Sequence, residues 1–161
     1  MCTVLFSYKT TPGYRLVLAA NRDEFFERPT APLGWWADDT EILAGRDLRE
    51  GGTWLGASKS GKYGVLTNFR EVPQSPEREK AISRGAILPG YLRAPQSGAE
   101  FITALENEAS KYRGFNLLVG DQASLGYYSN RGGKFLELPP GIYGLSNHLL
   151  DTPWPKVERG K

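Results

Sequence analysis

Short apolar runs separated by turn-forming residues are the feature that most constrains how this chain can fold. The 161 residues include 19 glycines and 11 prolines, and both residue types mark turns between short strands. No apolar run approaches the roughly 20 residues that a membrane-spanning helix requires. The sequence therefore predicts one strand-rich, soluble domain over residues 1–161, without a membrane span.

Two apolar runs at the start of the chain predict a β-hairpin. Residues 3–8 and 15–20 are apolar, and residues 10–13 (TTPG) between them are a good turn sequence. The polar stretch over residues 21–32 ends in prolines and is expected to be a loop. Further strands are expected at residues 41–44, 51–57, 63–69, 115–120, 125–129, 134–138 and 141–146.

The clearest helix is predicted at residues 98–112. Ser97 is the expected cap, and Glu100 completes a capping box. An apolar stripe then follows on one face of the helix. Gly114 is expected to end it.

Three other segments carry weaker signals. Residues 83–93 favour a second helix, and the charged residues 71–80 favour an exposed loop. Asp151 or Thr152 is expected to cap a helix with Pro153 in its first turn. Because few residues follow this start signal, we expect the chain to be a fragment of a longer protein.

Charge and residue counts argue against several classes of function. The net charge of +2 gives no reason to expect a nucleic-acid partner. One cysteine and one histidine allow neither an intrachain disulfide nor the usual four-ligand zinc site. The N-terminus has no basic leader. We therefore expect a cytoplasmic protein with a small-molecule ligand or substrate, and no metal or cofactor.

Cys2 is the first candidate for chemistry. Methionine is usually removed before a small residue, and the mature chain would then begin with a thiol beside a free amine. An α-amine and a thiol generally titrate close to neutrality, so the amine can act as base for the thiol, as in N-terminal nucleophile enzymes. The alternative is that Cys2 is a small buried apolar residue.

Four polar residues directly after the second predicted strand are the next candidates. Asn21, Arg22, Asp23 and Glu24 lie at the sheet end where Cys2 begins the neighbouring strand. An arginine beside a thiol favours the thiolate, and an aspartate can hold an ammonium or amide group. The alternative is a solvated hairpin end with a local ion pair.

Asn68 and Asn147 each close a predicted strand. A side-chain amide at such a place can donate to an oxyanion in the transition state, although asparagine is more commonly a turn former. Ligand sites are mostly apolar with a few polar groups. Aromatic residues such as Trp35, Trp36 or Trp54 are therefore expected to border a cleft near the polar loop.

Seven short motifs follow one another along the chain. They are Met1-Cys2-Thr3, Asn21-Arg22-Asp23-Glu24, Gly51-Gly52-Thr53-Trp54-Leu55-Gly56, Thr67-Asn68-Phe69-Arg70, Ser83-Arg84-Gly85, Gly114-Phe115-Asn116-Leu117-Leu118 and Gly144-Leu145-Ser146-Asn147. Together these motifs resemble the NRDE family, which is also the transport and Golgi organisation protein 2 family. The resemblance runs in order from Cys2 to Lys161, and members of that family are normally longer than this chain.

The NRDE family is in turn similar to the N-terminal nucleophile hydrolases, especially the conjugated bile acid and penicillin V amidases. The similarity implies an α+β fold, a four-layer sandwich with two antiparallel sheets between helix layers, incomplete at its C-terminus. It implies Cys2 as nucleophile, Asp23 holding the amine or the scissile group, and Asn68 and Asn147 binding the oxyanion. The amidase arginine precedes the asparagine of its motif, whereas Arg22 follows it here, so the thiol-activating arrangement is altered.

The resemblance implies two alternative functions. The first is a cysteine amidase acting on non-peptide C–N bonds, with Cys2, Arg22 and Asp23 in the active site. The second is a non-catalytic protein that binds and traffics haem, acyl-coenzyme A or lipid. Asn21, Glu24 and Trp54 are then the expected ligand-binding residues.

Overall fold

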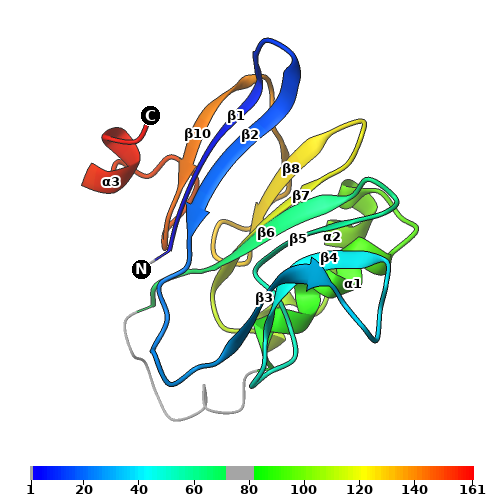
Figure 1. Ribbon diagram of the computed structural model, residues 1–161. Helices are drawn as coiled ribbons and strands as arrows, with labels where there is room; N and C mark the ends of the chain where they lie inside the picture. Colours follow the sequence, from blue (N-terminus) through cyan, green and yellow to red (C-terminus); the bar gives the residue numbers. More distant parts are fainter. Residues whose placement is uncertain (1, 72–81) are drawn as a thin grey trace.

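The computed structural model describes residues 2–71 and 82–161 and shows an α+β protein with two antiparallel sheets and few helices (Figure 1). This confirms the predicted class and the antiparallel sheets, while the N-terminal nucleophile hydrolase-like sandwich stays a prediction. The loop expected at residues 71–80 lies outside the described residues except for Glu71. The elements are β1 (Thr3–Thr11), β2 (Tyr14–Asn21), β3 (Thr30–Trp35), β4 (Ile42–Asp47), β5 (Leu55–Ser58), β6 (Tyr63–Asn68), α1 (Ile87–Arg93), α2 (Gly98–Glu106), β7 (Phe115–Gly120), β8 (Leu125–Ser129), β9 (Leu136–Glu137), β10 (Gly141–Leu145) and α3 (Pro155–Glu158).

The smaller sheet has three strands in the order β10-β1-β2. Its β1–β2 hairpin confirms the prediction, and Gly13 in the turn has φ +78°, a conformation that glycine adopts at no steric cost. Thr3 lies opposite Asn21, so the start of the chain lies beside the polar residues after β2. The predicted final strand, β10, pairs with β1, with Val4 opposite Leu145.

The larger sheet has seven strands in the order β3-β4-β5-β6-β7-β8-β9. Its edge strand β3 shows that the loop predicted over residues 21–32 is wrong at its C-terminal end. Pro32 is tolerated there because an edge strand has one side without ladder hydrogen bonds. The pairing with β4 also shifts between Ala31 and Gly34.

Strand bounds differ from the prediction on both sides of the turn after β4. The strand expected at residues 41–44 continues to Asp47. The strand expected at residues 51–57 begins only at Leu55, because the backbone before it bonds elsewhere. The Thr53 N–H donates to the Gly85 carbonyl at 3.2 Å, which ties this loop to the segment before α1.

The helix predicted at residues 98–112 ends earlier than expected. Its capping box is confirmed, since Ser97 Oγ accepts from the Glu100 N–H and the Glu100 carboxylate accepts from the Ser97 N–H. However, α2 ends after nine residues, and a separate 3-10 turn follows at Ala109–Lys111. The expected end at Gly114 is therefore wrong.

The two remaining helices are short. The predicted helix at residues 83–93 consists of a 3-10 turn at Arg84–Ala86 followed by α1. Trp154 occupies the N-cap position of α3, so the expected cap by Asp151 or Thr152 is wrong. The Asp151 carboxylate instead accepts from the Gly144 N–H at 2.8 Å. Within residues 2–71 and 82–161, no helix is long and apolar enough to cross a membrane.

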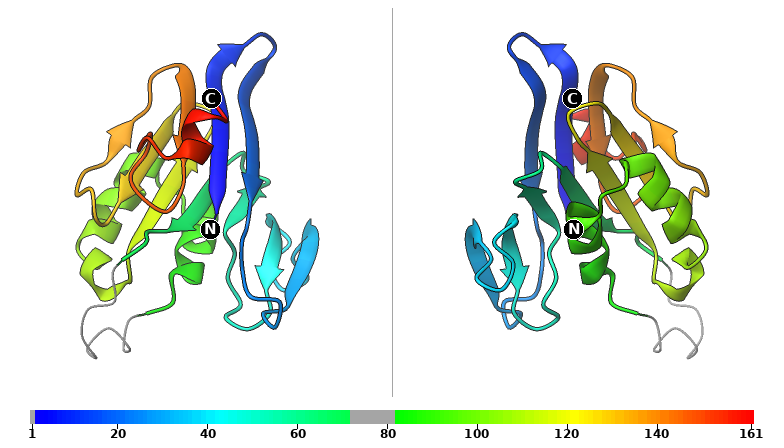
Figure 2. Two further views of the ribbon diagram at one scale, coloured as in Figure 1. Left: turned by 90° about the vertical axis from the view of Figure 1, so that its left-hand side faces the viewer. Right: turned by 90° about the vertical axis from the view of Figure 1, so that its right-hand side faces the viewer.

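The helices α1 and α2 pack on one face of the seven-stranded sheet, and the three-stranded sheet packs on its other face (Figures 1 and 2). Successive side chains of a strand point to opposite faces. In β7, Leu117 therefore packs in the cluster that contains Tyr91 of α1, while Leu118 packs in the cluster that contains Val4 and Phe6 of β1. On the other side of the small sheet, α3 contacts β1 and β10.

A buried polar network joins the two sheets. The fully buried Asn116 of β7 donates through Nδ2 to Thr67 Oγ1 at 3.2 Å and to the His148 carbonyl at 2.9 Å. Its Oδ1 accepts from the Tyr127 hydroxyl at 2.8 Å, and Thr67 Oγ1 donates to the Ser146 carbonyl at 3.2 Å. The segment that follows β10 is thereby bonded to β6, β7 and β8.

We predict that Asn116→Ala lowers the free energy of unfolding by roughly 3 kcal/mol, because buried partners lose their hydrogen bonds. Urea unfolding followed by circular dichroism measures the change. Asn107→Ala is the matched control, since Asn107 is exposed at the end of α2. Equal losses in both variants would show that the network does not hold the two sheets together.

Candidate functional site

A cavity of about 290 Å³ lies where the start of β1 meets the loop after β2 and the loop between β4 and β5. The end of β6 and the segment before α1 complete its walls. The lining contains six of the residues predicted for the site, which are Cys2, Arg22, Asp23, Glu24, Trp54 and Asn68. The structure therefore brings together chemistry from segments far apart in the sequence.

Cys2 is half-buried and lies at the cavity wall immediately before β1. Its backbone carbonyl accepts from Ser146 Oγ at 3.0 Å and from Lys156 Nζ at 3.2 Å. Ser146 follows β10 and Lys156 lies on α3, so both flank the start of the chain. These two bonds fix the backbone that carries the thiol.

Asn21 bridges the two strands of the hairpin at the same end. Its Oδ1 accepts from the Thr3 N–H at 3.1 Å, and its Nδ2 donates to Asp23 Oδ1 at 2.5 Å. Asn21 is not part of the cavity lining, whereas Asp23 is. The geometry therefore makes Asn21 a residue that holds Asp23 close to the start of β1.

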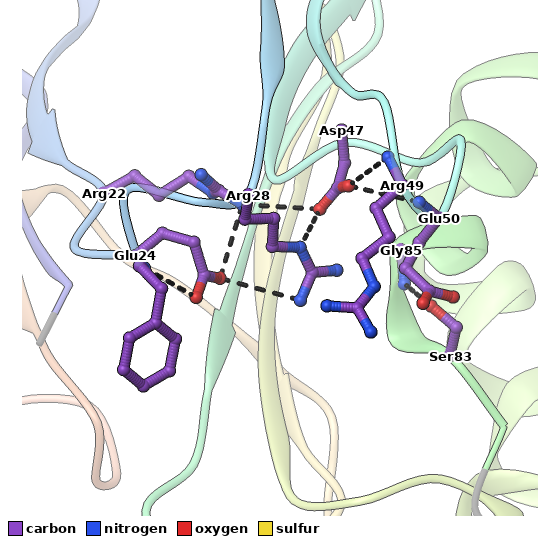
Figure 3. A network of polar contacts seen from close by, with 9 residues as sticks. Arg22, Glu24, Arg28, Asp47, Arg49, Glu50, Ser83 and Gly85 are labelled. Atoms are coloured by element: carbon purple, nitrogen blue, oxygen red, sulfur yellow. Dashed lines mark hydrogen bonds and ion pairs between the residues drawn. The ribbon is translucent and has the colours of Figure 1, made fainter.

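Arg22 takes part in an ion-pair network (Figure 3). Its Nη2 lies 3.3 Å from Asp47 Oδ2 and 3.3 Å from Glu24 Oε2, and its guanidinium lies 4.3 Å from the centre of the Trp54 ring. Arg28 Nε binds the same Asp47 oxygen at 2.6 Å. Two carboxylates thus already neutralise Arg22, and its role in favouring a thiolate stays a prediction.

Asp47 is the centre of that network. It is buried, and its Oδ1 accepts from the N–H groups of Arg49 at 3.0 Å and Glu50 at 3.1 Å (Figure 3). Burial on its own raises the pKa of Asp47, but the backbone N–H groups and Arg28 outweigh it and hold that pKa below its usual value. Asp47 therefore remains ionised and holds the loop after β2 against the turn after β4.

Two glycines, Gly52 and Gly85, allow the loop between β4 and β5 to lie against the segment before α1. These two segments form the cavity wall opposite the loop after β2. A Cβ atom added to Gly52 would lie 2.2 Å from the Gly85 carbonyl oxygen, which a side chain cannot do without moving the backbone. This close approach explains why two of the quoted motifs, GGTWLG and SRG, lie side by side. It places Arg84, between Ser83 and Gly85, in the cavity wall.

The two asparagines predicted for an oxyanion site lie together but in different environments. Asn68 is exposed and lines the cavity, whereas Asn147 is buried and outside the lining. Asn147 Nδ2 donates to the Asn68 carbonyl at 2.9 Å, which fixes the end of β6. Asn147 in this structure positions Asn68, and its own contact with a substrate stays a prediction.

Only one of the three tryptophans expected at the cleft lines it. Trp54 lies in the cavity wall, but Trp36 is buried in the core beneath α1 and Trp35 is exposed on β3, outside the lining. Sequence reasoning also missed Asp47, Arg28 and Arg84. The motif SRG was a signal for Arg84, while no sequence pattern indicates that Asp47 and Arg28 form an ion pair.

No cluster of three or more histidine, cysteine, aspartate or glutamate residues is positioned to hold a metal ion in residues 2–71 and 82–161. The cavity lining contains the cysteine Cys2, the amide of Asn68 and several charged side chains.

Comparison with known proteins identifies relatives along the entire chain. The family model for Transport and Golgi organisation 2 matches residues 1–161. The Transport and Golgi organization 2 homolog of Mus musculus is 40% identical and the Homo sapiens homolog 39% identical, and the Drosophila melanogaster protein of that name is 33% identical. Each match covers 100% of this chain and 62% of the relative. The chain thus spans less than two thirds of the length of these relatives.

We predict that Asp47→Asn flattens the pH dependence of stability. The pKa of Asp47 is lower in the folded protein than in the unfolded one, so its stabilisation is present above its unfolded pKa of about 3.9 and is lost as pH falls through the folded value. The wild type should lose more stability than the variant between about pH 5 and pH 2. At pH 7 the variant should be about 1.5–3 kcal/mol less stable.

Urea unfolding at a series of pH values measures both effects. Glu27→Gln is the matched control, because Glu27 is an exposed carboxylate in the loop after β2. Parallel curves for wild type and Asp47→Asn would contradict the assignment of Asp47 as the centre of the network.

Proposed function

The chain belongs to the Transport and Golgi organisation 2 family, and we propose that it carries a cysteine N-terminal nucleophile site that hydrolyses a non-peptide C–N bond. The observation that carries the proposal is that Cys2, Asp23 and Asn68 line one cavity. They come from the start of β1, the loop after β2 and the end of β6. These groups supply a nucleophile, a carboxylate and an amide donor in one place.

In the proposed reaction, removal of Met1 exposes the amine of Cys2, which takes the proton of the thiol. Cys2 Sγ then attacks the carbonyl carbon of the substrate amide, and the resulting oxyanion accepts a hydrogen bond from Asn68 Nδ2. Asp23 holds the ammonium group, which gives its proton to the leaving amine as the C–N bond breaks. Water hydrolyses the thioester, so that the products are an amine and a carboxylic acid and the thiol is regenerated.

The length of the relatives bears on the domain organisation. Because the chain spans 62% of the Mus musculus and Homo sapiens relatives, we propose that residues 1–161 are one part of a longer domain. A substrate of the complete protein then contacts further residues beside those of this cavity. The expected cytoplasmic location stays a prediction, since the relatives are named for transport and Golgi organization.

We predict that the purified protein lacks Met1 and that iodoacetamide adds one group, at Cys2. Because the chain has one cysteine, intact mass spectrometry reports both events without ambiguity. Labelling near pH 7 should be faster than for a cysteine peptide, since an adjacent base favours the reactive thiolate. A protein that keeps Met1 would rule out the proposed mechanism.

Variants then separate chemistry from structure. Cys2→Ala should abolish hydrolysis of a panel of N-acyl nitroanilides, and Asn68→Ala should slow it about 10²–10³-fold. Both should keep the unfolding free energy of the wild type, and Asn107→Ala should keep its rate. If Cys2→Ala unfolds the domain instead, the cysteine has a structural role.

A second function, ligand binding without turnover, is supported by two exposed aromatic residues beside the cavity. Phe25 and Phe26 follow Glu24 directly, and Phe25 is 81% exposed while Phe26 is fully exposed. Large apolar side chains exposed next to a cavity indicate a surface that binds an apolar group. This observation favours a ligand with an apolar part, such as haem or acyl-coenzyme A.

The binding hypothesis predicts that Phe26→Ser weakens the affinity for haemin or palmitoyl-coenzyme A about tenfold or more, because a buried phenylalanine contributes about 1.5–3 kcal/mol. Tryptophan fluorescence titration measures the affinity. Leu136→Ser, on the remote strand β9, is the matched control because Leu136 is half exposed. Equal affinities for wild type and Phe26→Ser would remove this loop from the ligand site.

A further inference from the structure

The arginines that line the cavity differ in whether they form ion pairs. Four arginines line it. Arg22 and Arg28 are paired with Asp47 and Glu24. The other two, Arg84 and Arg113, form no ion pair with a carboxylate in the described part of the chain. The charges of Arg22 and Arg28 are therefore balanced by ion pairs, whereas those of Arg84 and Arg113 are not. Asp23 and Glu50 also line the cavity, and within residues 2–71 and 82–161 no ion pair joins either of them to Arg84 or Arg113.

Arg84 is held rigidly in the cavity wall. Its side chain is half-buried, and Nη1 donates to the Gly114 carbonyl at 2.9 Å. The contact between Gly52 and Gly85 fixes the backbone next to it. Burial lowers the pKa of Arg84, and the charge of Arg113 lowers it further, but a guanidinium stays protonated at neutral pH.

The two acidic side chains that act on Arg84, Glu24 and Glu71, are each bound to other groups. Glu24 binds Arg22 and Arg28, as described above, and Glu71 binds Arg131 Nε at 2.6 Å and the Gly114 N–H at 3.1 Å. Glu24 and Glu71 act on Arg84 through space, without direct contact. Arg84 and Arg113 line the same cavity, and the charge of Arg113 disfavours that of Arg84. An anion placed between the two guanidinium groups removes that repulsion.

We propose that Arg84 and Arg113 form a subsite for an oxyanion, a carboxylate or a phosphate, on the ligand of this cavity. The guanidinium group suits both anions because its planar fork of donors matches two oxygen atoms. The hydroxyl of Ser83, which also lines the cavity, adds a further donor. The subsite itself does not depend on the proposed function. Only the orientation of the ligand, with its remaining part toward Cys2, rests on that function.

Titration of the full chain with inorganic phosphate and with succinate, at constant ionic strength, tests the subsite. Amide chemical shifts report the dissociation constant for each anion, and the tighter one identifies the group. Arg113→Gln should weaken binding about tenfold, as expected for one charge-assisted hydrogen bond. Because Arg113 is exposed, its replacement should leave the fold intact, and Arg84→Gln should abolish binding.

Arg93→Gln is the matched control, since it removes the same charge from α1, outside the cavity lining. The proposal is overturned if neither anion binds, or if Arg93→Gln weakens binding as much as Arg113→Gln. Cys2→Ala should bind the anion as the wild type does. If Cys2 is not labelled but the anion binds, only the hydrolase proposal is rejected. If Cys2 is labelled but neither anion binds, only the subsite is rejected.

Discussion

The geometry of the site depends on the way in which one buried amide, that of Asn116, joins the two sheets. Asn116 belongs to the seven-stranded sheet, yet Nδ2 donates to the carbonyl of His148 in the segment after β10. A buried amide is costly unless its donors and acceptor are satisfied, so this segment has one favourable position. Ser146 lies in the same segment and holds the carbonyl of Cys2. The position of the thiol relative to β6 and β7 thus follows from a contact outside the cavity.

The cavity wall formed by the loop between β4 and β5 and by the segment before α1 is also held by particular contacts. Its residues come from two loops, and loops position side chains well only when their backbones are held. Here the backbone of Gly52 lies against that of Gly85, and the N–H of Thr53 bonds to the same residue. Asp47 closes the arrangement by binding Arg28 and Arg22 from the loop after β2. A site made of loops is thereby held by backbone contacts and by one buried carboxylate.

Local sequence patterns predicted the elements that are determined by residues close together in the sequence. The hairpin of β1 and β2 follows from two apolar runs and a turn. Its register, with Thr3 opposite Asn21, places Cys2 beside the polar residues that follow β2. The capping box of α2 is likewise local. Edge strand β3 was missed because Pro32 argues against a strand unless its place in the sheet is known. Asp47 was missed because its arginine partners, Arg22 and Arg28, are more distant in the sequence than a local pattern reaches.

The network around Arg22 changes how the two functions are weighed. The sequence predicts Arg22 as the cation beside the thiol. In the structure its charge is balanced by Glu24 and Asp47, so the attraction that it offers to a further anion is small. In the proposed subsite that attraction comes from Arg84 and Arg113, on the other wall of the cavity. The proposed nucleophile at Cys2 then depends on its own amine as base. The proposed ligand, whether hydrolysed or only bound, would be oriented by the wall opposite the NRDE motif.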